Sequence, residues 1–144
     1  MPVAADKYDL LGPALSMIGR AAMSVVGGQP DGVYLYVEAG DGWVGPSLYK
    51  DEGSQVRYFD PGRSDLCDAL FDAWYIEEPD KRWTVMHYTI NGGKFDAKFD
   101  FGTLRRPGES DDDRRERILH ARYGDKPIIY PPMPAGAQEY RPAS

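Results

Sequence analysis

The sequence has little of what several classes of protein require. Its 144 residues include one cysteine, Cys67, and two histidines, so it cannot build a disulfide framework and offers little material for a zinc site. No apolar run approaches the ~20 residues of a membrane span, and no basic start followed by an apolar core of signal-peptide type is visible. We therefore expect a cytoplasmic protein without a metal or another cofactor.

Positive charge is also in short supply. Seventeen lysines and arginines stand against 23 aspartates and glutamates, which gives a formal net charge of −6 and a pI near 4.9. Such a chain repels nucleic-acid phosphates and anionic membranes, so the expected partner is a basic protein. The length suits one domain that buries ~68–70% of its unfolded surface. We expect that domain over residues 1–134 and a flexible, proline-containing tail over residues 135–144.

The clearest structural signal is the stretch from Trp83 to Phe101, WTVMHYTINGGKFDAKFDF. Apolar and polar residues alternate on both sides of Asn91-Gly92-Gly93, which predicts a β-hairpin. Two registers preserve the alternation. A two-residue turn at Asn91-Gly92 sets His87 opposite Asp96, whereas a four-residue turn pairs Ile90 with Phe95.

The alternation also predicts how the hairpin is buried. One face is apolar, and the other should be open to water, as is common in antiparallel sheets. The residues expected on the open face are Trp83, Val85, His87 and Thr89, opposite Asp100, Lys98, Asp96 and Lys94.

The other segments predict three strands and three helices. Runs of β-branched and aromatic residues separated by glycine-rich turns indicate strands at Val33–Val37, Trp43–Lys50 and Gln55–Phe59. Apolar spacing indicates a first helix from about Gly12 to Val26, with Pro13 tolerable only in its first turn. The predicted fold class is α+β: an antiparallel meander of about five strands with N-terminal, middle and short C-terminal helices.

The middle and C-terminal helices have recognisable starts. Ser64 can cap the middle helix, which should stop near Glu78 because Pro79 follows. Its predicted buried stripe is Leu66, Leu70, Phe71, Trp74 and Tyr75. Ser110 opens the C-terminal helix, whose apolar content is so thin that we expect it to pack on the rim of the sheet. Ile128-Ile129-Tyr130 could pin the segment that follows to the body of the protein.

Signals for catalysis are weak. No phosphate-binding glycine loop, nucleophile elbow or histidine pair at metal spacing is present. Asp96-Ala97-Lys98 imitates the acid-x-lysine strand of metal-dependent nucleases, but alternating charges on a solvated strand produce the same triplet. We therefore expect no enzyme, with a hydrolase built on His87, Asp96, Lys98 and Asp100 as an alternative. Cys67 is expected to be a packing residue.

A family resemblance adds to this picture. Trp83-Thr84, the strand after it and Gly93–Phe101 resemble the signature hairpin of the YezG-like family of bacterial antitoxin or immunity proteins. Val33–Val37 is similar to that family's first strand, and Arg114 through Gly124 resembles its closing helix. The resemblance covers roughly residues 8–130. It implies a small α+β protein that binds and neutralises the toxin domain of a polymorphic toxin system, often a nuclease. A non-catalytic adaptor or structural interaction module is the other alternative.

Binding to such a toxin predicts acidic contacts and aromatic anchors. The acidic candidates are Asp96 and Asp100 on the hairpin, Glu77 and Glu78 at the end of the middle helix, and Asp111, Asp112 and Asp113 at the start of the last helix. The aromatic candidates are Trp43 and Tyr49, together with Tyr58. A small sheet also needs aromatics for its core, so for these three an interface and a core position are both open.

Overall fold

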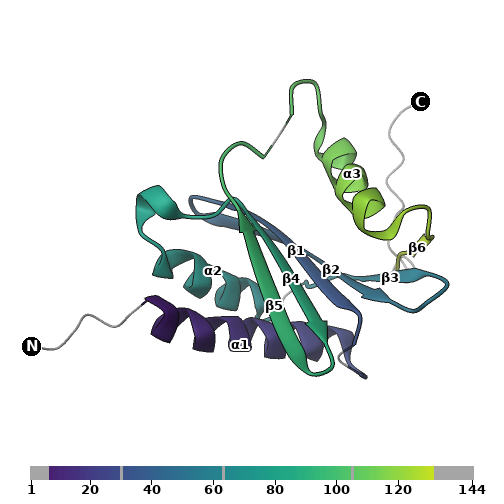
Figure 1. Ribbon diagram of the computed structural model, residues 1–144, viewed down its shortest axis with the longest axis horizontal. Helices are drawn as coiled ribbons and strands as arrows, with labels where there is room; N and C mark the ends of the chain where they lie inside the picture. Colours follow the sequence, from purple (N-terminus) through teal and green to yellow (C-terminus); the bar gives the residue numbers. More distant parts are fainter. Residues whose placement is uncertain (1–6, 30, 63, 105, 132–144) are drawn as a thin grey trace, which may run out of the picture.

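The computed structural model describes residues 7–29, 31–62, 64–104 and 106–131. Its elements are, in order, α1 (Lys7–Val26), β1 (Val33–Gly40), β2 (Trp43–Asp51), β3 (Val56–Phe59), α2 (Leu66–Ile76), the short 3-10 helix η1 (Pro79–Lys81), β4 (Val85–Asn91), β5 (Lys94–Asp100), α3 (Asp111–Tyr123) and β6 (Ile128–Ile129). The strands form one sheet in the order β5-β4-β1-β2-β3-β6, antiparallel except for the parallel pair β3 and β6 (Figure 1). The predicted α+β class is confirmed, and Ile128-Ile129 is the strand that joins the chain's last described segment to the sheet.

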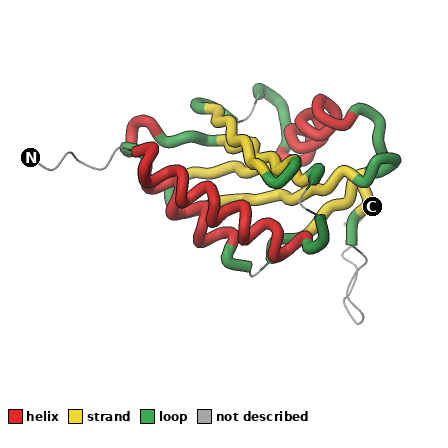
Figure 2. The backbone as a smooth tube through the Cα atoms, turned by 60° about the horizontal axis from the view of Figure 1, so that its bottom comes forward, coloured by secondary structure: helices red, strands yellow, loops and turns green. Residues whose placement is uncertain are grey.

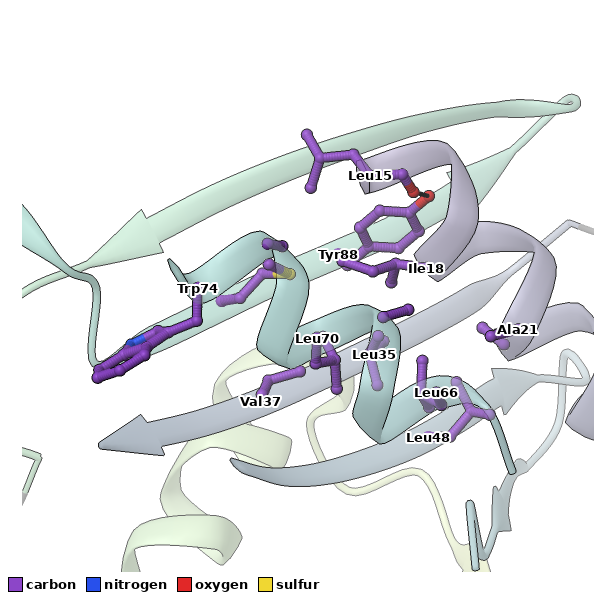
Figure 3. Close-up of a cluster of buried hydrophobic side chains, with 14 of the residues drawn as sticks. Leu15, Ile18, Ala21, Leu35, Val37, Leu48, Leu66, Leu70, Trp74 and Tyr88 are labelled. Carbon is purple, nitrogen blue, oxygen red and sulfur yellow. Dashed lines mark hydrogen bonds between the residues drawn. The ribbon is translucent and has the colours of Figure 1, made fainter. Parts of the chain in front are cut away.

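Helices α1 and α2 pack side by side on one face of the sheet, and α3 lies on the other face (Figure 2). The core between the helix pair and the sheet takes Ile18 from α1, Leu35 from β1 and Leu70 from α2, none of which has exposed surface (Figure 3). Each such side chain contributes about 1.5–3 kcal/mol by leaving water. No helix in the described part of the chain is long and apolar enough to cross a membrane.

The second face of the sheet is not simply open to water. Its core contains Tyr34, Tyr36, Tyr49, Val56, Val85 and Leu119, the last of which comes from α3. The C-terminal helix therefore packs across β1 and its neighbours, and the expectation that it lies on the rim is wrong. The open-face expectation is wrong for Val85, which is buried here, and for Trp83, which precedes β4 and is buried in the first core. A helix with little apolar content suffices because the tyrosines of the sheet supply most of the packing surface.

The hairpin adopts the second of the two predicted pairings. Ile90 lies opposite Phe95, so His87 faces Lys98 and not Asp96. The turn itself consists of Gly92 and Gly93, both with positive φ, as a tight two-residue turn requires. Side chains outside the turn hold it in place, because Asn91 Oδ1 accepts a hydrogen bond from the Gly32 N–H at 3.0 Å and Asp31 accepts one from the Gly92 N–H.

Helix boundaries differ from the expectation in two places. Helix α1 is already formed at Lys7, so Pro13 lies beyond the first turn; its position is exposed, where water can satisfy the carbonyl that loses its partner. Helix α2 begins at Leu66, whose N–H donates to Ser64 Oγ at 3.3 Å.

The buried stripe of α2 differs in part from the prediction, whereas the cap of α3 agrees with it. The buried stripe of α2 uses Ala69 and Ala73 in place of Phe71 and Tyr75, and Tyr75 is 52% exposed. Ser110 caps α3 as predicted, in a reciprocal capping box with Asp113. The predicted tail, residues 135–144, lies outside the described residues.

Helix α1 is fixed to the sheet by a contact that needs a glycine. The buried Tyr88 hydroxyl donates to the Leu15 carbonyl at 2.7 Å, and a Cβ on Gly19 would lie 2.5 Å from that hydroxyl oxygen. Gly19→Ala should therefore destabilise the protein by about 1–3 kcal/mol, as overpacking does. Urea unfolding measures the change.

Gly12→Ala is the matched control in the same helix, because its Cβ would meet no described atom within 4 Å. It should be neutral or stabilising by up to about 1 kcal/mol. Tyr88→Phe removes the clashing oxygen, so adding Gly19→Ala to that variant should cost much less than in the wild type. Equal effects of the two alanines would contradict the assignment.

Candidate functional site

His87, the histidine of the hydrolase alternative, is held on both sides. Its Nδ1 lies 2.8 Å from the Tyr34 hydroxyl, and its Nε2 lies 3.0 Å from Asp100 Oδ2. Burial raises the pKa of Tyr34 well above its usual value, so its hydroxyl keeps a proton that it can donate to Nδ1. Both ring nitrogens of His87 therefore have partners inside the protein, a hydroxyl on one side and a carboxylate on the other.

A cleft of about 510 Å³ separates the end of the hairpin from α3. His87 and Asp100 line it from the sheet, Phe101 from the loop, and Arg117 and Arg122 from the helix. Asp96 and Lys98 do not line this cleft, so only half of the proposed hydrolase set is brought together. Among the described residues, no group of three histidine, cysteine, aspartate or glutamate side chains could hold a metal ion.

The arginines of α3 are largely used within the protein. Arg114 is buried and donates to Glu38 through Nε at 2.5 Å and Nη2 at 2.7 Å, which ties α3 to β1. Arg117 pairs with Glu109 at 2.8 Å. Arg122 lies over the Tyr34 ring, 4.0 Å from its centre. The Arg114 and Arg122 contacts hold the helix on the sheet, whereas the Arg117 pair joins it to the loop that precedes it.

Glu38 is the acid on which this attachment depends. Burial opposes its ionisation, but hydrogen bonds from Arg114 and Tyr36 outweigh burial and lower its pKa below the usual value. The same contacts raise the pKa of Arg114 further, so the pair stays charged. Its side chains are 14% and 7% exposed, so this is a buried ion pair and not a surface one.

The predicted acidic contacts do not converge on one surface. Most of them have a local role. Glu78 pairs with Lys81 at 3.4 Å, Asp111 with Arg114 at 3.1 Å, and Asp113 completes the cap of α3. Asp96 and Asp112 are exposed, and Glu77 is half-buried at the C-cap of α2.

The aromatic candidates separate clearly. Trp43 is 44% exposed and remains available as an anchor, whereas Tyr49 has no exposed surface. Tyr49 packs against Tyr58 and Tyr123 in the second core, so its expected partner-binding role is wrong. Tyr58 is half-buried in the same cluster. Cys67 is half-buried on α2, and burial raises the pKa of its thiol, which suits the expected packing role.

A surface that the sequence did not reveal lies between α1 and α2. We call it the α1–α2 groove; it has a volume of about 520 Å³. Its apolar lining includes Ala14, Ala21 and Ala69, together with Met17, which is 53% exposed. Its charged residues are Arg20 from α1 and Asp65, Asp68 and Asp72 from α2.

The three aspartates give the groove a predominantly negative charge. Across the described residues, none of them has a lysine or arginine within salt-bridge distance. Asp65 and Asp68 suit the positive end of the helix dipole, but Asp72 lies a turn too far to benefit. Asp68 and Asp72 are four residues apart on the helix, a like-charge spacing that destabilises a helix by about 0.2–0.5 kcal/mol. Neither the helix dipole nor a like-charge pair at this spacing gives Asp72 a stabilising role in α2.

The available signal for this groove was the spacing of Asp65, Asp68 and Asp72, which places the three on one side of a helix. This spacing was not used in predicting contact residues from the sequence. The groove itself depends on how α1 lies against α2, which the spacing does not give.

No protein-family model matches the chain, and no curated protein sequence matches it.

The Glu38–Arg114 pair predicts an acid-dependent loss of stability. Glu38 has a lower pKa in the folded protein than its usual value of about 4.3 in an unfolded chain. Between these two values the unfolded chain binds more protons, so the free energy of unfolding falls as the pH falls. The contribution is complete above about pH 5 and is lost through the folded pKa.

Glu38→Gln should remove this part of the pH dependence and lower the free energy of unfolding at pH 7 by about 3 kcal/mol, the cost of breaking a buried pair. Urea unfolding at a series of pH values measures both. Glu52→Gln, in the exposed Glu52–Arg57 pair, is the control and should change stability little at pH 7. Equal losses from the two substitutions would rule out a special role for Glu38.

Proposed function

We propose that this chain is an immunity protein that binds and neutralises a basic bacterial toxin domain by direct contact, with the α1–α2 groove as its contact surface. The observation that carries the proposal is a set of three aspartates around an apolar groove that have no ion-pair partner among the described residues. If the toxin is a nuclease, the lysines and arginines that bind its nucleic-acid phosphates could bind these carboxylates instead. Met17 and the alanines would meet apolar stems of the same residues.

The sequence resemblance to the YezG-like immunity family supports the same function. So does the net charge of −6, which favours association with a basic protein. An enzymatic role has less support, because Asp96 and Lys98 of the hydrolase set do not line the cleft that His87 and Asp100 share.

The contact surface is tested by reversing charge at two matched pairs of positions. Asp68→Lys with Asp72→Lys alters the groove; Asp112→Lys with Glu116→Lys makes the same change in net charge at the same helical spacing on α3. All four residues are exposed. Each chain is co-expressed with the toxin domain encoded beside it, and cell survival and co-purification are scored. The groove variant should bind at least tenfold more weakly and lose protection, whereas the α3 variant should keep both.

Each alternative result has a distinct meaning. Loss of binding by the α3 variant alone would move the contact to α3 and keep the immunity function. Survival of cells without a complex would favour an enzyme that reverses the toxin's damage. Failure of the wild-type chain to protect would overturn the proposed function. Circular dichroism confirms that each variant is folded.

The dependence of the association rate on salt provides a second test, because dissolved ions screen the long-range attraction between acidic residues and a basic toxin. The Debye length is about 10 Å at 0.1 M salt and about 3 Å at 1 M, so added salt should slow association steeply while changing dissociation less. Stopped-flow mixing with the toxin domain measures both rates. An association rate that is independent of salt would contradict steering by acids.

A further inference from the structure

Strand β5 forms an edge of the sheet without a neighbour beyond it among the described residues. It is seven residues long, and five of these positions are exposed. The opposite edge is the two-residue strand β6. Proteins normally keep open edges short or protect them, because unpaired backbone groups recruit other strands. An edge of this length therefore needs a partner or a device that excludes one.

The direction of the backbone groups along β5 follows from its pairing with β4. The Ile90 carbonyl accepts from the Gly32 N–H, so Ile90 directs its backbone groups toward β1. Its partner on β5, Phe95, therefore directs its own toward the open edge, and by alternation so do Ala97 and Phe99. These three residues supply the edge's free donors and acceptors.

The sequence of this edge is complementary to itself. Written Lys94-Phe95-Asp96-Ala97-Lys98-Phe99-Asp100, it reverses each charge about Ala97. We propose that two copies of this chain form a symmetric dimer by antiparallel pairing of their β5 strands about Ala97. Lys94 then lies opposite Asp100 of the second copy, and Asp96 lies opposite Lys98 of the second copy.

Backbone geometry and charge select the same register. Pairing about Ala97 sets the outward-facing Phe95 opposite Phe99 of the second copy, so the hydrogen-bonding residues meet one another. The charged residues then occupy the positions between them, where strands approach most closely. A shift by two residues sets Asp96 against Asp96 of the second copy, or Lys98 against Lys98, and like charges directly opposite are destabilising. The charges thus disfavour these two shifted registers and favour the register centred on Ala97.

The apolar face of the hairpin also gains from this pairing. Phe95 is 41% exposed and stacks on Tyr88 with ring centres 5.4 Å apart. In the dimer it acquires Phe99 of the second copy as a cross-strand neighbour. The apolar layer beneath the sheet then continues from one copy to the next, as in isologous assemblies.

Two exposed residues allow the charge pattern to be changed without breaking contacts inside the hairpin. Asp96 lies opposite Thr89, and Lys98 lies opposite His87; neither is part of an ion pair within the described residues. Asp100 is left unchanged because it contacts His87. None of the residues of the α1–α2 groove lies on β5, so the dimer does not rest on the proposed function.

The test is sedimentation equilibrium of the purified chain over a range of concentrations. The wild type should show a monomer–dimer equilibrium. Asp96→Lys sets two pairs of lysines opposite each other, and Lys98→Asp sets two pairs of aspartates, so each variant alone should dimerise at least tenfold more weakly. An equimolar mixture of the two variants should form a heterodimer, because the new lysine at position 96 then faces the new aspartate at position 98.

The double variant Asp96→Lys with Lys98→Asp should recover the homodimer, and it has the wild-type net charge. Native mass spectrometry with one copy isotopically labelled identifies the heterodimer, and urea unfolding confirms that each variant is folded. A wild type that stays monomeric at millimolar concentration would overturn the proposal. So would a dimer that single charge reversals leave intact, or variants that dimerise no better when mixed.

Discussion

Strand β1 must be covered on both faces, and the arrangement of the helices follows from that requirement. Val33, Leu35 and Val37 face one side and Tyr34 and Tyr36 the other, and all five are buried. A central strand with no wet side cannot belong to a sheet that packs against one layer only. Helices α1 and α2 therefore cover the aliphatic face, and α3 covers the tyrosine face.

The two helical layers are attached by different means. Apolar packing holds α1 and α2, and the Tyr88 hydroxyl adds a directed bond to the α1 backbone beside Gly19. Helix α3 buries little aliphatic surface and relies on the Glu38–Arg114 pair and on aromatic contacts with Tyr123. Breaking a buried ion pair is costly, so a helix with few apolar residues can still hold one position.

This difference in attachment determines where charge is left over. Three of the four arginines of α3 contact Glu38, Glu109 and the Tyr34 ring, and the fourth, Arg115, is exposed. Asp68 and Asp72 of α2 form no ion pair with any described residue, and together with Asp65 they line the groove beside α1. Strand β5 adds an edge whose charges alternate. The proposed toxin surface and the proposed dimer edge therefore lie on separate parts of the molecule. The first is mainly acidic, and the second alternates between positive and negative charge.

The sequence by itself determined the elements whose signals are local. The alternation in Trp83–Phe101 and its glycine pair predicted the hairpin, and Ser110 with Asp113 marked the start of α3, because turns and caps depend on neighbouring residues alone. Only the tertiary structure decided the hairpin register, the burial of Tyr49 and Val85, and the meeting of α1 with α2 to form the groove. These depend on contacts between residues far apart in the chain, such as Asp31 with Gly92, for which a single sequence carries no local pattern.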